Sequence, residues 1–152
     1  MRRDRGEKVR FMSLLSVFDI SSSAINAESM RLNVTASNLA NAESVAPSEQ
    51  AAYRARHPVF ATQLRQLSAD PATDESGVGV RVLGVVQSAA APIKRYQPDH
   101  PLADASGYVY GSNVNPVEEL TNMLSASRSY QGNVDVMTTA RDLLVKTLAL
   151  GH

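Results

Sequence analysis

Both ends of the chain carry long rows of residues, at least half of them apolar, at alternating spacings of three and four, which places side chains on one face of an α-helix. Neither proline nor glycine interrupts residues 13–41. The row in this segment is Leu14, Phe18, Ser21, Ile25, Glu28, Leu32, Thr35 and Leu39. At ~1.5 Å per residue, the pattern predicts a helix ~43 Å long.

The last segment has signals for both the start and the end of a helix. Asn115 is a good N-cap, Pro116 occupies the first helical position, and Gly151 marks the stop. Glu118 and Glu119 fall in the first turn, where the helix dipole favours negative charge. The row in this segment is Leu120, Met123, Ser127, Tyr130, Val134, Met137, Arg141, Leu144 and Leu148. It predicts a coiled-coil-type seam between the two helices.

The residues between the two helices have the pattern of a small β region. Prolines and a glycine interrupt residues 42–77. A strand is predicted over 79–86, with 93–96 and 107–110 as its partners. Within 53–67 the pattern favours a short strand followed by an amphipathic piece around Phe60, Leu64 and Leu67.

The predicted fold class is therefore mainly α with a small β insert. The long N- and C-terminal helices form an α-helical hairpin or coiled coil, and the β-rich domain lies between them. Three parts follow from this division. Residues 1–11 are a polar, disordered extension, with a basic anchor on acidic lipid as the alternative. Residues 12–42 with 113–152 form the terminal-helix domain, and residues 43–112 form a loop and β-rich outer module.

Composition excludes several classes of protein. The 15 basic and 15 acidic side chains cancel, so the chain offers no basic surface for nucleic acid. The absence of cysteine excludes disulfide scaffolds, thiolate metal sites and cysteine nucleophiles. The outer helix faces carry Ala, Ser and Asn instead of the usual Glu and Lys. Such faces favour contact with other copies or relatives of the chain.

Candidate catalytic residues are few. The histidines are His57, His100 and His152, and none has metal-ligand spacing. Asp104 and His100 could form a hydrolase's base, but turn chemistry around two prolines explains them equally well. No nucleophile, base and oxyanion site come together in the sequence. We therefore expect a protein that is not an enzyme, with no cofactor, metal or small-molecule substrate.

Several segments resemble a known family. Residues 31–42 resemble the N-terminal signature of bacterial flagellar axial proteins of the rod and hook. Residues 96–109, 113–115, 118–123 and 125–133 are similar, within that family, to the proximal rod proteins, as is the opening segment from Met12 to Ile20. The resemblance spans essentially residues 12–151. Departures occur at Gly111–Ser112, where the family commonly has a proline, at Gly132, where alanine is usual, and in the loop after Ala42, which lacks the usual glycines.

The resemblance implies a structural subunit of the basal-body proximal rod, the drive shaft that transmits torque from motor to hook and filament. Its implied partners are other proximal and distal rod subunits, copies of itself, a rod-base adaptor to the MS ring, and the flagellar type III export apparatus. Its implied location is the rod in the periplasmic space, reached without a cleaved signal peptide. A soluble helical adaptor or export chaperone of a type III secretion system is the alternative.

The residues expected to make subunit contacts come from the signature segment and from the last helix. For each apolar one, a role within the chain's own helix pair is an equal alternative. The set is Asn33, Ser37, Asn38, Leu39, Asn41, Leu120, Met123, Arg128, Tyr130, Asn133, Val134 and Met137.

Overall fold

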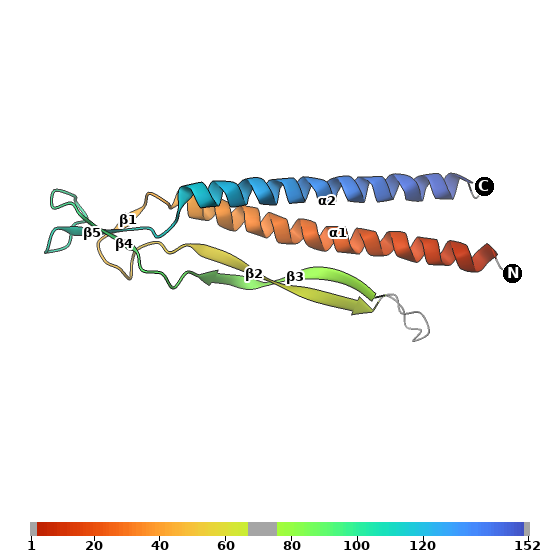
Figure 1. The fold of residues 1–152 in the computed structure, drawn as a ribbon, viewed down its shortest axis with the longest axis horizontal. Helices are drawn as coiled ribbons and strands as arrows, with labels where there is room; N and C mark the ends of the chain where they lie inside the picture. The colour runs from red at the N-terminus through yellow and green to blue at the C-terminus, as the bar shows by residue number, and fades with distance from the viewer. Residues whose placement is uncertain (1–2, 67–75, 151–152) are drawn as a thin grey trace. The chain divides into compact units, whose positions relative to one another are not determined.

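The computed structural model describes residues 3–66 and 76–150. Two long helices lie at the ends of the chain, α1 (Arg3–Ala40) and α2 (Pro116–Leu150), and the strands lie between them in sequence (Figure 1). The predicted combination of two terminal helices with a small β region is confirmed. Helix α1 begins at Arg3 instead of residue 13, so it includes most of the segment for which the composition predicts a disordered extension.

The start of α2 agrees with its sequence signals. The Asn115 side-chain Oδ1 accepts a hydrogen bond from the Val117 N–H at 3.1 Å, which is the bond of an N-cap. Helix α2 follows from Pro116, with Glu118 and Glu119 in its first turn. The predicted stop at Gly151 lies outside the described residues. Neither described helix contains a stretch that is long and apolar enough to cross a membrane.

The strands form two separate sheets. Strands β1 (Val45–Ala46), β5 (Tyr108–Gly111) and β4 (Ile93–Tyr96) make an antiparallel sheet in that order. Strands β2 (Arg56–Gln66) and β3 (Ser76–Gln87) pair only with each other. In the first sheet Ile93 lies opposite Gly111, and Tyr96 lies opposite Tyr108.

The predicted pairing of the 79–86 strand is wrong, because its partner is β2 and not β4 or β5. Strand lengths explain the difference: β2 and β3 have 11 and 12 residues, whereas β4 and β5 have 4 each. A ladder between strands of matched length leaves fewer backbone groups unpaired. The amphipathic piece is also wrong, because Phe60 and Leu64 lie within β2. Leu67 lies outside the described residues.

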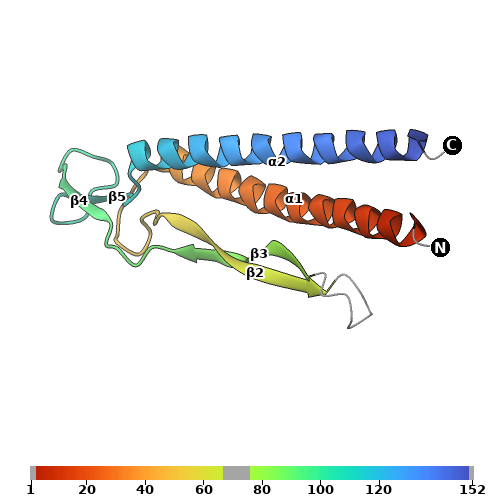
Figure 2. The same cartoon turned by 45° about the vertical axis from the view of Figure 1, so that its right-hand side comes forward.

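The chain divides into two compact units. Unit 1 contains residues 1–29, 60–83 and 127–152, and unit 2 contains residues 30–59 and 84–126. In each unit taken by itself, its portion of α1 lies beside its portion of α2, with the chain running in opposite directions (Figures 1 and 2).

Small side chains make up most of the interior of both units. In unit 2, Ala42, Ala55 and Val114 form a core cluster against which Tyr53 packs. Among the side chains of unit 1 that the structure describes, the buried ones are Ser21, Ala27 and Ala140. An alanine core removes little apolar surface from water, and larger apolar side chains such as Leu120 and Leu143 are exposed.

Candidate functional site

One face of α2 is turned toward the protein interior along the whole helix. Its positions repeat at spacings of four and three, and every one is buried or half-buried. They are Glu119, Met123, Ala126, Tyr130, Asn133, Met137, Ala140, Leu144 and Thr147. The predicted heptad row has the same spacing and shares every second position with this row. Its other positions lie one residue later in the chain.

This shift corrects the predicted seam. Met123, Tyr130, Met137 and Leu144 belong to both rows and are half-buried. The other interior positions include Ala126, which is 0% exposed, and Ala140, which is 4% exposed. The large or long side chains predicted there are exposed instead: Leu120, Val134, Arg141 and Leu148. Alanine at positions 126 and 140 lets a neighbouring segment approach α2 more closely there than leucine would.

As a result, α2 carries large apolar side chains on its outside. In unit 2, Val117 is 72% exposed, Leu120 53% and Leu124 54%. Their spacing of three and four places them on one face of the helix. In unit 1 the exposed apolar residues of α2 are Val134, Val136, Leu143, Val145 and Leu148. We call Val117, Leu120 and Leu124 the outer apolar face.

Asn38 lies in the signature segment and is predicted to make a subunit contact. In the structure it is 1% exposed and hydrogen-bonded within the chain. Its Nδ2 donates to the Arg56 carbonyl oxygen at 2.8 Å, and its Oδ1 accepts from the Arg56 N–H at 2.9 Å. The Tyr53 hydroxyl donates to the same Oδ1 at 3.0 Å and lies 3.1 Å from the Ser37 Oγ. The carboxamide therefore pairs with Arg56 as a strand backbone would and fixes the start of β2 on α1.

A second asparagine holds the same segment from another direction. The Asn113 Oδ1 accepts from the Ala55 N–H at 2.7 Å, and its Nδ2 donates to the Ala90 carbonyl oxygen at 2.8 Å. The Ser88 N–H donates to the Ala55 carbonyl oxygen at 2.7 Å. Sequence reasoning missed this arrangement, although Asn113 lies within a segment that resembles the proximal rod proteins. An asparagine just before a helix gave the only signal.

The other candidate contact residues differ in accessibility. Two of the asparagines donate a hydrogen bond to the carbonyl oxygen four residues earlier in the chain. Asn41 Nδ2 donates to Ser37 and Asn133 Nδ2 donates to Ser129, each at 2.8 Å. The half-buried members are Ser37, Leu39, Asn41, Met123, Tyr130, Asn133 and Met137. The exposed members are Asn33, Leu120, Arg128 and Val134.

The residues weighed for a hydrolase have turn roles. The His100 Nδ1 accepts from the Leu102 N–H at 3.1 Å. The Asp104 Oδ1 accepts from the N–H groups of Ser106 and Tyr108 at 2.8 and 2.9 Å. Among the described residues, no three His, Cys, Asp or Glu side chains are placed to hold a metal ion. His152 lies outside the described residues.

Hydrogen bonding also sets the acidity of Asp104. The Tyr108 N–H is the main group that lowers the pKa of the Asp104 carboxyl from its ordinary value of 3.8. Desolvation raises this pKa, but the Ser106 N–H, the Tyr110 hydroxyl and the Lys94 ammonium all lower it. The Tyr110 hydroxyl donates to Oδ2 at 3.3 Å. The folded loop therefore stabilises the charged form of the Asp104 carboxyl.

The two ends of the chain match sequence models of known families. A family described as flagella basal body rod protein matches residues 18–45, which contain the C-terminal part of α1. A family described as the C-terminal region of flagellar basal body rod FlgEFG proteins matches residues 105–150, which contain α2.

Relatives of known name match over their entire length. The flagellar basal-body rod protein FlgC of Salmonella typhimurium is 47% identical over 141 residues, which are 93% of this chain and 100% of the relative. The proteins of the same name from Yersinia enterocolitica and Escherichia coli O6:H1 are each 49% identical with the same coverage. Identity at this level over whole relatives, together with the two matched ends, shows that the chain belongs to the FlgC family of flagellar basal-body rod proteins.

Proposed function

We propose that this protein is a structural subunit of the proximal rod of the bacterial flagellar basal body. The single observation that supports this most strongly is the outer apolar face of α2, because a free helix gains nothing from exposed Val117, Leu120 and Leu124. Contact with a neighbouring subunit would remove this surface from water. Subunits joined through different, non-closing surfaces build a helical shaft, which is the form that torque transmission requires.

The helix pair is the axial part of the proposed subunit. We propose that α1 and α2 act as a coiled-coil-type hairpin, with residues 12–42 and 113–152 as its domain and residues 43–112 as the outer module. The repeat of interior positions on α2 supports this proposal. Residues 1–11 are proposed to be an extension outside the axial domain. The relatives' alignments cover 141 of the 152 residues.

We propose that the exposed members of the predicted contact set, Asn33, Leu120, Arg128 and Val134, touch neighbouring subunits directly. The half-buried and buried members, Asn38 among them, contribute by fixing the helix faces that are presented. The proposed neighbours are copies of this chain, other proximal and distal rod subunits, and the rod-base adaptor to the MS ring. We further propose export through the flagellar type III apparatus without a cleaved signal, and assembly in the periplasmic space.

The direct test uses a flagellated strain in which this chain replaces the host's own copy. Leu120→Glu with Leu124→Glu places two charges on the outer apolar face, whereas Gln131→Glu changes the charge at an exposed polar position of the same helix. We expect the double variant to be exported and folded but at least severalfold depleted from isolated basal bodies, and Gln131→Glu to assemble normally. Normal motility and incorporation of the double variant would contradict the proposal. Retention of the unsubstituted chain in the cytosol would favour an adaptor or chaperone.

A further inference from the structure

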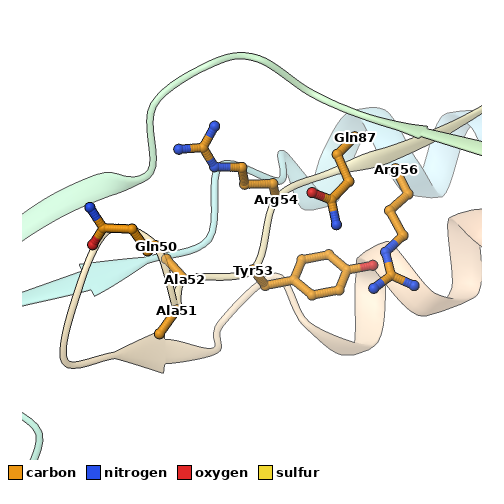
Figure 3. Close-up of a pocket in the computed structure, with 7 residues that line it drawn as sticks. All are labelled: Gln50, Ala51, Ala52, Tyr53, Arg54, Arg56 and Gln87. Atoms are coloured by element: carbon orange, nitrogen blue, oxygen red, sulfur yellow. The ribbon is translucent and has the colours of Figure 1, made fainter.

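A pocket of about 510 Å³ lies in unit 2, where the chain approaches β2 and leaves β3 (Figure 3). Its lining is Gln50, Ala51, Ala52, Tyr53, Arg54, Arg56 and Gln87. Figure 3 shows the Tyr53 ring and the Gln87 amide between the side chains of the two arginines. The pocket is therefore lined by two guanidinium cations, the amide groups of two glutamines and an aromatic ring.

Both arginines belong to one short segment whose backbone is held by hydrogen bonds. Arg54 and Arg56 flank Ala55, and their side chains lie on opposite sides of the Tyr53 ring and the Gln87 amide (Figure 3). The Asn38 carboxamide holds the Arg56 backbone on α1, and Asn113 holds the intervening Ala55. The two side chains therefore leave a backbone segment that hydrogen bonds hold from two directions.

The charge of the pocket is only partly balanced within the chain. Arg54 Nη2 lies 3.4 Å from Glu49 Oε1, a contact between half-buried and exposed side chains. The Arg56 guanidinium lies 5.4 Å from the centre of the Tyr53 ring. In the part of the chain that the structure describes, no acidic side chain lies within ion-pair distance of Arg56. One net positive charge is therefore left beside donors from Gln50 and Gln87.

We propose that this pocket receives an aspartate or glutamate side chain of a neighbouring rod subunit. Guanidinium groups present fixed pairs of N–H donors that match a planar carboxylate. Arginines as exposed as these bind a free small anion weakly, because water and salt screen the charge. The rest of an interface would hold an acidic side chain of a neighbouring subunit at the pocket, so that its binding does not depend on the ion pair alone. The ion pair then fixes the register of the two subunits.

This inference rests on the proposed function and can be tested in isolated basal bodies. The Arg56→Lys variant places a primary amine in the pocket while its backbone bonds with Asn38 stay possible. A water-soluble carbodiimide activates a carboxylate in contact with that amine, the amine displaces the activated oxygen as a urea, and an amide bond remains. Mass spectrometry of the digested basal bodies then identifies both residues.

The matched control is Arg81→Lys, which places an amine at another exposed arginine, on β3, that does not line the pocket. The unsubstituted chain gives the background from its own lysines. We expect position 56 to be joined to an acidic residue of another subunit, at a yield several times that of position 81. A yield no higher than the control, or a bond only to Glu49 of the same chain, would overturn the inference.

A second variant tests the energetic role of the pocket. We expect Arg54→Gln with Arg56→Gln to keep the unfolding midpoint of the free chain and to dissociate severalfold more from basal bodies washed at raised salt. Unchanged retention would contradict the inference, as would tight binding of inorganic phosphate to the free unsubstituted chain. If the unsubstituted chain were absent from basal bodies, the proposed function itself would fail. Presence there without the cross-link rejects the pocket alone.

Discussion

The side chain of Asn38 pairs with both backbone polar groups of Arg56, donating to the carbonyl oxygen at 2.8 Å and accepting from the N–H at 2.9 Å. A helix has no free backbone groups along its side that could pair with a strand. The carboxamide supplies this pair from the surface of α1, and so the first residue of β2 is bonded as if it had another strand beside it. Asn38 therefore bonds the start of β2 to α1, while Asn113 holds the preceding Ala55.

We therefore expect Asn38→Ala to lower the free energy of unfolding by about 1–3 kcal/mol, because it leaves the N–H and carbonyl oxygen of Arg56 without their side-chain partner and leaves the Tyr53 hydroxyl with Ser37 alone. Urea denaturation of the purified chain measures the change. Asn33→Ala, at an exposed position on the same helix, should stay within about 0.5 kcal/mol. Equal effects of the two substitutions would show that the Asn38 bonds are not needed.

Gly107→Ala should lower the free energy of unfolding by about 1–3 kcal/mol. The φ of Gly107 is +80°, a left-handed conformation that alanine adopts with strain. Its added Cβ would also lie 2.9 Å from Tyr96 Cε2 and 3.2 Å from Pro98 Cβ. Thermal and urea unfolding measure the loss. Stability equal to that of the unsubstituted chain would mean that this turn relaxes freely.

Gly132→Ala should instead raise the free energy of unfolding. Gly132 is exposed within α2, and an added Cβ would meet no atom within 4 Å. Alanine there reduces the entropy of the unfolded chain and favours the helix, so we expect the free energy of unfolding to rise by about 0.5–1 kcal/mol. The same denaturation series measures it. A loss of stability would show that the helix is not continuous at this residue.

The loop that closes on Asp104 should weaken in acid. Because its folded-state pKa lies below 3.8, the carboxylate contributes stability above that value and loses it as the pH falls through the folded pKa. NMR titration should show the amide resonances of Ser106 and Tyr108 moving together below pH 3.8. In Asp104→Asn that coupled titration should be absent. Coupled titration centred above 3.8 would contradict the hydrogen-bond account.

The start of α2 was predictable because its signals are local. Asn115 and Pro116 determine the start of α2 within a few residues, and no distant segment can change that chemistry. The partner of β3 was not predictable, since pairing with β2 depends on which strand of matching length the fold brings near it.

The register of the interior row on α2 was also beyond the sequence. Large apolar side chains such as Leu120 and Leu148 fit a heptad pattern as well as Ala126 and Ala140 do. One sequence alone does not indicate which of these residues pack within the chain and which face another subunit. The same limit applies to Asn38. Its residue type is compatible with subunit contact, and only the position of Arg56 reveals the bonds that bury it.

We propose that the outer apolar face of α2 becomes covered when the subunit enters the rod. The chain has no cysteine, so Leu124→Cys introduces a single thiol on that face and Ala105→Cys introduces one in an exposed loop. The measurement is the rate of maleimide labelling of each variant, first as free chain and then in isolated basal bodies. The account predicts fast labelling of both free chains and labelling at position 124 that is at least about tenfold slower than at position 105 in basal bodies, as expected for a contact of more than about 1.4 kcal/mol. Equally fast labelling of both positions in the assembled rod would contradict it.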